Sequence, residues 1–210
     1  MPSSNAKNRD VVAIYGTTGS GKSTCFRQRF MTRDRLVVFD VCEEYDLPTI
    51  AASPVDLIRA MKPGKGGFRI SYRPTSMDLP LELHRLATAL WERQKIDADP
   101  VPVTLAIEEA NSCYGVNQLP RDQRGMDKLV LQGRHQRVSL VAVTQRPSLI
   151  SANLRGNLSD IFCFPLTFPE DRRLVGNLIP PGSDVRLSDA PHHFMHWNQG
   201  AVENGKNDPP

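Results

Sequence analysis

Short apolar runs rich in Val and Ile recur along the chain, and most of them end at a polar or glycine-rich segment. Such runs are typical of strands that are buried on both faces of a parallel sheet. We expect strands at 11–15, 36–39, 68–72, 103–107, 138–144 and 161–164. Between them, apolar residues at helical spacing predict helices at 23–33, 55–61, 81–95, 121–134 and 170–178.

This alternation of strands and helices predicts an α/β fold, with a mostly parallel central sheet and helices on both faces. A chain of 210 residues is long enough for one full domain of this kind. We place the domain at 10–200. The segments 1–9 and 201–210 are polar and contain several Pro and Asn residues, so we expect flexible tails there.

The composition is that of a globular protein. Hydrophobic residues make up 40% and charged residues 23%, which argues against a disordered, collagen-like or coiled-coil chain. The formal net charge of +3 is too small to indicate a nucleic-acid partner by itself. No run approaches the roughly 18 apolar residues of a membrane span, and the first residues lack the apolar core of a signal peptide. We therefore expect a cytosolic protein with no membrane span of its own.

Neither the cysteines nor the histidines predict a metal site. The four cysteines lie far apart without a C-x-x-C pair, which favours reduced thiols over a zinc ribbon or a disulfide framework. They are Cys25, Cys42, Cys113 and Cys163. His192, His193 and His196 have no neighbouring Cys, Asp or Glu at metal-site spacing.

One segment carries a complete phosphate-binding motif. Residues 16–23 read G-T-T-G-S-G-K-S, which matches G-x-x-x-x-G-K-[ST], and they stand between a predicted strand and a predicted helix. In such a loop, backbone N–H groups surround phosphate oxygens, and the helix adds its positive end. The residues expected to bind the nucleotide are Gly16, Thr17, Thr18, Gly19, Ser20, Gly21, Lys22, Ser23 and Thr24. The alternative is a glycine-rich turn without a ligand.

Two residues of this loop have separate roles toward ATP and Mg²⁺. We expect Lys22 to place its charge on the β and γ phosphates, and Ser23 to place its hydroxyl on the Mg²⁺ that bridges them.

A carboxylate pair follows the predicted strand at 103–107, at the sheet edge where ligands bind. We assign Glu108 to the Mg²⁺ shell and Glu109 to the attacking water. The alternative is an exposed acidic pair that opens a loop.

The phosphate-binding motif and the carboxylate pair indicate a P-loop NTPase, and the segment 133–148 indicates which group of these proteins the chain resembles. It reads G-R-H-Q-R-V-S-L-V-A-V-T-Q-R-P-S. It resembles the segment of the FtsK/HerA-type DNA-pumping ATPases in which an Arg at a helix end leads into an apolar strand that ends in T-Q-R-P. The resemblance covers roughly residues 10–178.

Two further stretches agree with this resemblance. Asp40, followed by Glu44 and Tyr45, is similar to the "D…G-E-Y" element of HerA-like proteins, with Glu43 in place of the Gly. Glu108-Glu109-Ala110 is similar to their "D-E-A" element, with Glu in place of the Asp.

The resemblance implies a P-loop NTPase fold of the RecA-like type, with an additional strand and a catalytic glutamate. It makes Gln145 the sensor that hydrogen-bonds the γ-phosphate or the attacking water. It makes Arg134 an arginine finger that reaches the nucleotide of the neighbouring subunit. Arg137 is the competing candidate for the finger. Without the resemblance, both arginines would be interpreted as solvated cations near a helix C-terminus.

Basic residues gather between 121 and 137, where five of them stand against two acids. In a ring, part of this segment could line the channel and contact DNA phosphates without reading bases. The candidates for these contacts are Arg121, Arg124 and Lys128. Aromatic residues are sparse here, which favours a duplex over a single strand. The alternative is a solvated helix face.

Together these features predict an ATP-hydrolysing motor that translocates double-stranded DNA independently of its sequence. The resemblance implies a homo-oligomeric ring, which we expect to be a hexamer. The short chain is most similar to the genome-packaging ATPases of membrane-containing icosahedral DNA viruses. Such a protein would work in the host cytoplasm or at the packaging vertex of the virion, docked on a capsid vertex or a portal-like protein. The alternatives are a conjugation or filamentous-phage export ATPase, a small P-loop nucleotide or metabolite kinase, and a non-hydrolysing nucleotide-gated scaffold.

Overall fold

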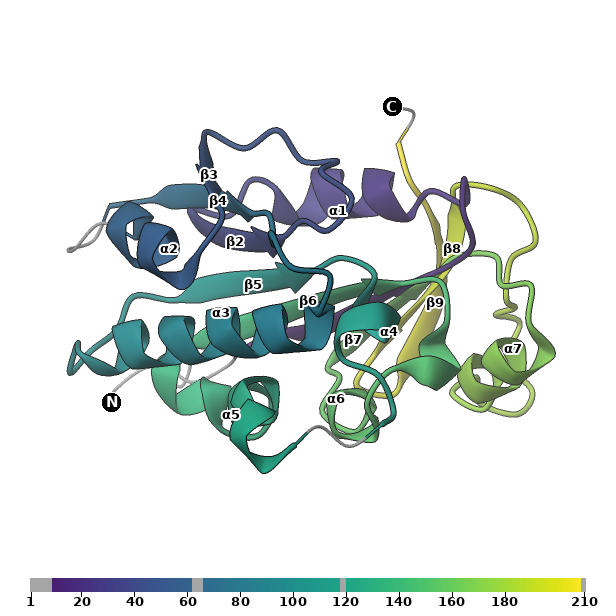
Figure 1. Ribbon diagram of the computed structural model, residues 1–210. Coiled ribbons are helices and arrows are strands. Elements are labelled where there is room, and N and C mark those ends of the chain that lie inside the picture. The colour runs from purple at the N-terminus through teal and green to yellow at the C-terminus, as the bar shows by residue number, and fades with distance from the viewer. Residues whose placement is uncertain (1–8, 62–65, 118–119, 209–210) are drawn as a thin grey trace, which may run out of the picture.

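One sheet runs through the molecule and fixes the order of its parts. The computed structural model describes residues 9–61, 66–117 and 120–208. In these residues, nine strands form the sheet in the spatial order β3-β4-β2-β5-β6-β1-β7-β8-β9 (Figure 1). The strands are β1 Val11–Tyr15, β2 Arg35–Phe39, β3 Thr49–Ala51, β4 Phe68–Tyr72, β5 Val103–Ile107, β6 Val138–Thr144, β7 Asp160–Cys163, β8 His193–Asn198 and β9 Ala201–Lys206.

Strands β1 to β7 pair in parallel, so their carboxyl ends meet at one edge of the sheet. Every predicted strand is present, and no bound differs from the prediction by more than one residue. Strand β6 pairs with β5 on one side and with β1 on the other. Strand β6 therefore lies between β5, which precedes the carboxylate pair, and β1, which precedes the phosphate-binding motif. This arrangement confirms the predicted α/β fold with an additional strand.

Helices cover both faces of the sheet, as predicted (Figure 1). Residues Val12 and Ile14 of β1 pack against Phe26 and Phe30 of α1, and the opposite face packs against α3 and α5. The α-helices are α1 Lys22–Phe30, α2 Pro54–Ala60, α3 Leu79–Lys95, α4 Ala110–Cys113, α5 Gly125–Gln132, α6 Ala152–Arg155 and α7 Pro169–Gly176. Short 3-10 helices lie at Arg121–Gln123, Gly133–Gln136 and Pro147–Leu149. Among the described residues, no helix combines the length and the hydrophobicity that crossing a membrane requires.

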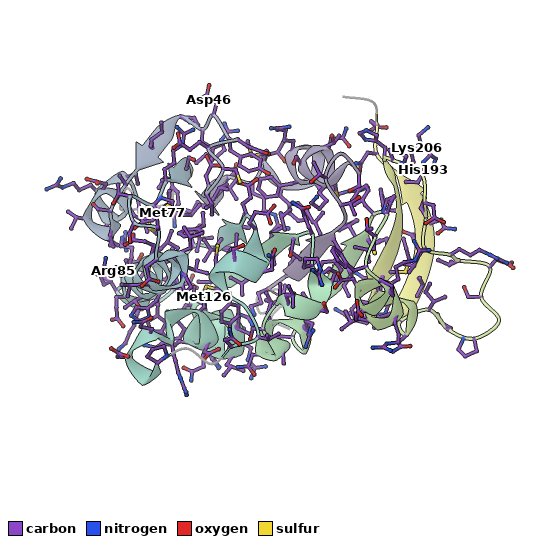
Figure 2. All side chains as sticks on the ribbon, turned by 45° about the vertical axis from the view of Figure 1, so that its right-hand side comes forward. Asp46, Met77, Arg85, Met126, His193 and Lys206 are labelled. Carbon is purple, nitrogen blue, oxygen red and sulfur yellow. The ribbon has the colours of Figure 1, made fainter. Side chains whose placement is uncertain are left out.

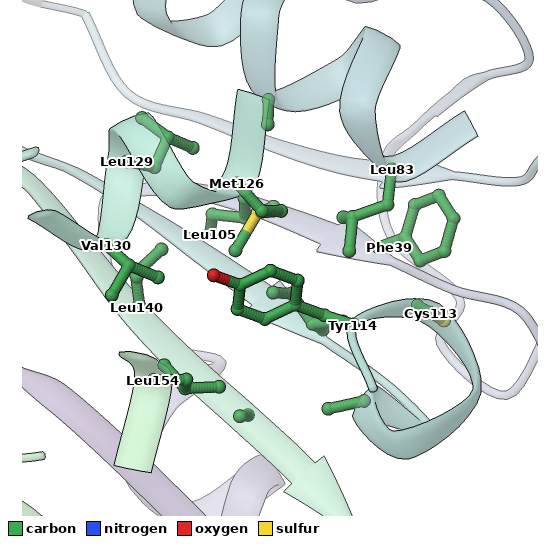
Figure 3. Packing of buried hydrophobic residues seen from close by; sticks show 14 of the residues in the cluster. Phe39, Leu83, Leu105, Cys113, Tyr114, Met126, Leu129, Val130, Leu140 and Leu154 are labelled. Atoms are coloured by element: carbon green, nitrogen blue, oxygen red, sulfur yellow. The ribbon is translucent and has the colours of Figure 1, made fainter. Parts of the chain in front are cut away.

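Tyr114, which follows α4, closes the core between the sheet and α5. Its ring lies in the same apolar cluster as Leu105 of β5 and Met126 of α5, with the hydroxyl directed toward α5 (Figure 3). The hydroxyl donates a hydrogen bond to Asp127. This contact attaches the segment after β5 to the helix that follows it.

The helix predicted at 121–134 is wrong in its extent. The chain forms a 3-10 helix at Arg121–Gln123, and α5 begins only at Gly125. Gly125 lies so close to α3 that a Cβ atom there would be 2.6 Å from the carbonyl oxygen of His84. The N–H of Gly125 also donates to Nδ1 of His84 at 2.9 Å. Contact with α3 therefore sets the start of α5, and apolar periodicity does not reveal such a contact.

The flexible tail predicted at 201–210 is wrong for residues 201–206, which form strand β9. Strand β8 pairs antiparallel with β7, and β9 pairs antiparallel with β8; His193 and Lys206 lie opposite each other (Figure 2). The residues of the connecting turn, Gln199 and Gly200, both have positive φ, as tight hairpin turns require. Because β9 is an exposed edge strand, its polar composition resembles that of a tail.

The N-terminal tail prediction is largely untested. Residues 1–8 lie outside the described residues, as do 209–210. Arg9, which is described, donates hydrogen bonds to the carbonyl oxygens of Leu129 and Val130 at the end of α5. At this residue the chain is attached to the domain.

Candidate nucleotide-binding site

The loop between β1 and α1 lies at the carboxyl edge of the parallel strands. Its first residue, Gly16, leaves no room for a side chain, because a Cβ atom there would be 2.5 Å from Oγ of Ser20. The N–H of Gly16 donates to the carbonyl oxygen of Thr144 at 3.2 Å, and that of Thr17 donates to Pro165 at 2.9 Å. The segments that end β6 and β7 therefore support the base of the loop.

Lys22 begins α1 and folds back over this loop. Its Nζ donates to the carbonyl oxygen of Thr17 at 2.7 Å, and the residue is buried. Burial lowers the pKa of the Lys22 ammonium, and the carboxylates of Glu109 and Glu44 oppose that shift. Oγ of Ser20 is also buried, with no hydrogen-bond partner in the described part of the chain. A cation and an unpaired hydroxyl inside a curled loop fit the phosphates of a nucleotide.

Glu108 and Glu109 follow β5 at the same edge of the sheet. Glu108 is buried, and the N–H of Cys42 donates to its Oε2 at 3.3 Å. The pKa of Glu108 is raised to about 7, first by burial and then by the neighbouring carboxylate of Glu44, while the Cys42 N–H opposes the shift. A bound cation would favour the charged form of this carboxyl group.

Gln145 connects the carboxylate pair to the phosphate-binding loop. It follows β6, between the ends of β5 and β1. Its Nε2 donates to Oε1 of Glu109 at 2.9 Å, and its Oε1 accepts a hydrogen bond from Oγ1 of Thr18 at 3.1 Å. These three predicted site residues therefore come together in one hydrogen-bonded chain, which could hold a water molecule between the carboxylate and the loop.

Glu44 is a site residue that our assignment of roles omitted. The hydroxyl of Ser23, in the first turn of α1, donates to Oε2 of Glu44 at 3.4 Å. The resemblance to the "D…G-E-Y" element included Glu44, but no local pattern indicates that it lies beside Ser23. Its proximity depends on the loop after β2, which folds back toward α1.

Asp40 holds the loop that carries Glu44. Asp40 is fully buried and accepts hydrogen bonds from the N–H groups of Glu44 and Tyr45, at 2.9 and 3.3 Å. It also accepts from Oγ of Ser71 at 2.6 Å and from Nε of Arg73 at 3.4 Å. These four donors, one of them the guanidinium of Arg73, fix the position of the buried carboxylate. Asp40 therefore acts on the position of Glu44 through the backbone.

Glu43 explains the departure from the "D…G-E-Y" element. Its φ is 55°, in the left-handed region where glycine is favoured. The Glu43 carboxylate lies 3.2 Å from Nη1 of Arg73. Glu43 therefore has a backbone conformation that glycine favours, although it carries a side chain.

The residues beside the loop also fit a magnesium ion. The hydroxyl of Ser23 donates to the carboxylate of Glu44, whose charge also acts on the carboxyl group of Glu108, so all three offer hard oxygen donors beside the loop. Magnesium is usually held by one or two carboxylates together with substrate phosphates and water. This donor set is therefore suited to a Mg²⁺ ion shared with a nucleotide.

Arg134 lies far from the loop of its own chain. It belongs to the 3-10 helix Gly133–Gln136 before β6, whereas Gln145 follows the other end of this strand. The 7 residues of β6 span about 23 Å. Arg134 is exposed, and no carboxylate pairs with it among the described residues, whereas Nη2 of Arg137 lies 2.7 Å from Asp99.

The structure describes the side chains of two of the three DNA-contact candidates. Arg124 is exposed and lines a cavity of about 250 Å³ beside Tyr114. Lys128 lies over the ring of Trp91, 4.6 Å from its centroid, and 3.5 Å from the carboxylate of Glu92. The side chain of Arg121 lies outside the described part of the chain.

Comparison with solved structures identifies the fold. The genome packaging NTPase B204 of Sulfolobus turreted icosahedral virus 2, in complex with ATP-gammaS, superposes with a TM-score of 0.75 at 18% identity, over 98% of this chain and 100% of that chain. The DNA-packaging ATPase B204 of Sulfolobus turreted icosahedral virus has a TM-score of 0.69 at 14% identity, over 97% and 100%. The chain has the fold of these packaging ATPases.

A more distant ATPase shares this fold. EssC (ATPases 2 and 3) of Geobacillus thermodenitrificans has a TM-score of 0.60 at 11% identity, over 98% of this chain and 40% of that chain. The sequence matches no family model and no curated protein. These similarities agree with the predicted P-loop NTPase fold.

Proposed function

We propose that the protein is a Mg²⁺-dependent ATPase. This proposal rests on two hydrogen bonds, from Thr18 to Gln145 and from Gln145 to Glu109, which connect the phosphate-binding loop to a carboxylate. A kinase that transfers phosphate to a small acceptor does not require such a carboxylate for water. The proposal is also supported by the fold neighbour B204, which has been solved with ATP-gammaS and with AMPPCP.

Each site residue has a role in this reaction. Lys22 and the backbone N–H groups of the loop bind the phosphates, and Ser23, Glu44 and Glu108 hold Mg²⁺. Glu109 accepts a proton from a water molecule that Gln145 orients. The water oxygen bonds to the γ-phosphorus as the bond to the β–γ bridging oxygen breaks, which yields ADP and phosphate. Mg²⁺, when bound, neutralises charge on the phosphate oxygens.

The ATPase works as a homo-oligomeric ring, for which we propose six subunits. Arg134 of one subunit completes the site of its neighbour. The exposure of Arg134 at the amino edge of the sheet supports this role, and the ion pair of Arg137 with Asp99 makes Arg137 the weaker candidate. A guanidinium at the transferred phosphoryl group contributes a factor of about 10³ to 10⁵ in turnover.

The polymer that the ring moves is double-stranded DNA, and the task is to package a viral genome into a preformed capsid. The fold neighbours that are described as packaging ATPases support this proposal. Arg121, Arg124 and Lys128 are the proposed phosphate contacts, which would be independent of sequence. The ring would dock on a capsid vertex or a portal-like protein, in the host cytoplasm or at the packaging vertex.

The experiment that tests this function is phosphate release from ATP and Mg²⁺ by the full chain, with and without long duplex DNA. We expect hydrolysis that DNAs of unrelated sequence stimulate equally, and none from Lys22→Ala. Transfer of the γ-phosphate to a small acceptor would instead indicate a kinase. Hydrolysis at an undiminished rate by an isolated subunit, without any effect of DNA, would contradict the motor.

A mixing experiment tests the role of Arg134 at the subunit boundary. Lys22→Ala lacks the phosphate-binding side of the site, and Arg134→Ala lacks the finger. If the finger acts between subunits, random mixing of the two inactive variants restores roughly a quarter of the sites. No recovery, together with recovery in a mixture of Lys22→Ala and Arg137→Ala, would assign the finger to Arg137.

A further inference from the structure

The hairpin formed by β8 and β9 ends against the phosphate-binding loop. The N–H of His192 donates to the carbonyl oxygen of Ser20 at 2.7 Å, and Nδ2 of Asn207 donates to that of Gly21 at 2.8 Å. The N–H of Asn207 donates to the carbonyl oxygen of His192 at 2.9 Å, which joins the two contacts. The residues that flank the hairpin therefore hold the two residues that precede Lys22.

The contact between the hairpin and the loop is closely packed. Gly21 has a φ of +110°, and a Cβ atom there would lie 3.0 Å from both Nδ2 of Asn207 and Nδ1 of His192. Asn207 is only 3% exposed. Its Oδ1 and the Nδ1 of His192 are buried, with no hydrogen-bond partner among the described atoms. Unpaired buried polar atoms destabilise a fold, so stability alone does not account for this arrangement.

These hydrogen bonds orient two consecutive peptide groups of the loop. Both peptide groups are trans, and in a trans peptide the C=O and the following N–H point in opposite directions. Since the carbonyls of Ser20 and Gly21 point to the hairpin, the N–H groups of Gly21 and Lys22 point away from it. In a loop of this kind, such N–H groups bind the phosphate oxygens.

We propose that Asn207 is a positioning residue for nucleotide binding, which acts through the Gly21 carbonyl on the N–H of Lys22. This proposal rests on the proposed ATPase function and adds the C-terminal hairpin to the ATP site. The N–H of Cys25 in α1 also donates to the Gly21 carbonyl, at 2.9 Å, so Asn207 is the second of two donors to this oxygen. Without Asn207 the peptide group is held on the α1 side alone, and the nucleotide must supply the remaining order, so affinity falls. Because these N–H groups contact the phosphates both before and during hydrolysis, turnover changes little.

The test compares Asn207→Asp with the matched variant Asn204→Asp, both assayed above neutral pH. Both variants add one negative charge, but Asn204 is exposed on β9 and does not face the loop. We expect Asn207→Asp to raise KM for ATP and Kd for AMPPCP about tenfold, with kcat within about twofold of the unmodified protein. Asn204→Asp should leave all three unchanged. An unchanged KM and Kd for Asn207→Asp, with only a lower Tm, would overturn the proposal.

A second measurement does not depend on a variant that folds. Coupling between two sites is reciprocal. If the hairpin and the bound phosphates order the same peptide groups, AMPPCP must therefore slow hydrogen exchange of the backbone N–H of Asn207 in the unmodified protein. Exchange that AMPPCP leaves unchanged, at a concentration that saturates the protein, would contradict the proposal. Failure of the unmodified protein to bind AMPPCP would count against the ATPase function itself, which separates the two outcomes.

Discussion

The side chains of Gln145 and Glu109 are joined by a hydrogen bond of 2.9 Å between Nε2 and Oε1. The two residues follow neighbouring parallel strands, and the amide oxygen of Gln145 faces the hydroxyl of Thr18. In the proposed ATPase, Gln145 would therefore respond to the contents of the phosphate-binding loop and transmit the change to the carboxylate. A γ-phosphate that takes Thr18 or the Gln145 amide as a partner would alter the orientation of Glu109.

Glu109→Gln should separate ATP binding from hydrolysis. The amide keeps the size of the side chain but cannot accept a proton from water, so we expect turnover to fall by about 10² to 10⁴. Affinity for ATP, measured by calorimetry, should change by less than about threefold, since Glu109 is assigned no contact with the phosphates. Glu170→Gln, an exposed change at the start of α7, is the control. Turnover that survives in Glu109→Gln would remove this residue from the mechanism.

Glu44→Gln should weaken the use of Mg²⁺ without unfolding the protein. The change removes a charge beside Ser23, so we expect the Mg²⁺ concentration for half-maximal hydrolysis to rise about tenfold. Asp46→Asn alters an exposed carboxylate on the same loop and should have no effect (Figure 2). Equal Mg²⁺ requirements in all three proteins would show that Glu44 does not contribute to the cation site.

The stability of the free protein should depend on the ionisation of Glu108. Its pKa in the folded protein is raised from 4.5 to about 7, chiefly by burial and then by Glu44. The folded state therefore keeps a proton that the unfolded chain releases. Without ATP and Mg²⁺, the free energy of unfolding should fall as pH rises from 4.5 through about 7, by up to about 3 kcal/mol.

The measurement for this prediction is urea unfolding between about pH 5 and about pH 8, compared with Glu108→Gln. The variant cannot ionise at this position, so its free energy of unfolding should lack this component of the pH dependence. Parallel curves for the two proteins would mean that Glu108 ionises normally in the folded state.

Asp40→Asn should destabilise the domain far more than a change in the other carboxylate that pairs with Arg73. Asp40 is fully buried, whereas the Glu43 side chain is 67% exposed. Breaking the buried pair should cost about 3 kcal/mol in the free energy of unfolding, and Glu43→Gln less than about 1 kcal/mol. Urea unfolding measures both values. Similar small losses would show that the hydrogen bonds of Asp40 do not hold the loop after β2.

Six of the seven parallel strands were predictable because they are largely buried on both faces, whereas the short strand β3 has two exposed residues and was not predicted. β1 is a continuous apolar run and β6 is apolar except for Ser139 and Thr144, and this pattern identifies them without tertiary information. The strand character of β9 instead comes from pairing with β8, while its own side chains are polar and exposed. Local pattern therefore could not distinguish β9 from a tail.

The candidate site was predictable only where chemistry fixes the spacing of residues. The phosphate-binding loop is such a case, since one short segment contains all of the residues that the motif assigns to the phosphates. Glu44 and Asn207 reach the loop through the fold, from after β2 and after β9. The surroundings of a candidate residue also come from the fold: Lys128 lies over the ring of Trp91, which no local pattern indicates.

The hydrogen bond from Asn207 to Gly21 joins residues that are 186 positions apart. Nearly the whole domain must therefore be synthesised before this hydrogen bond to the phosphate-binding loop can form. A nascent chain that carries the glycine-rich motif but not yet the hairpin would compete poorly for cellular ATP. In the proposed ring, a chain would thus become competent for nucleotide only when its synthesis is almost finished.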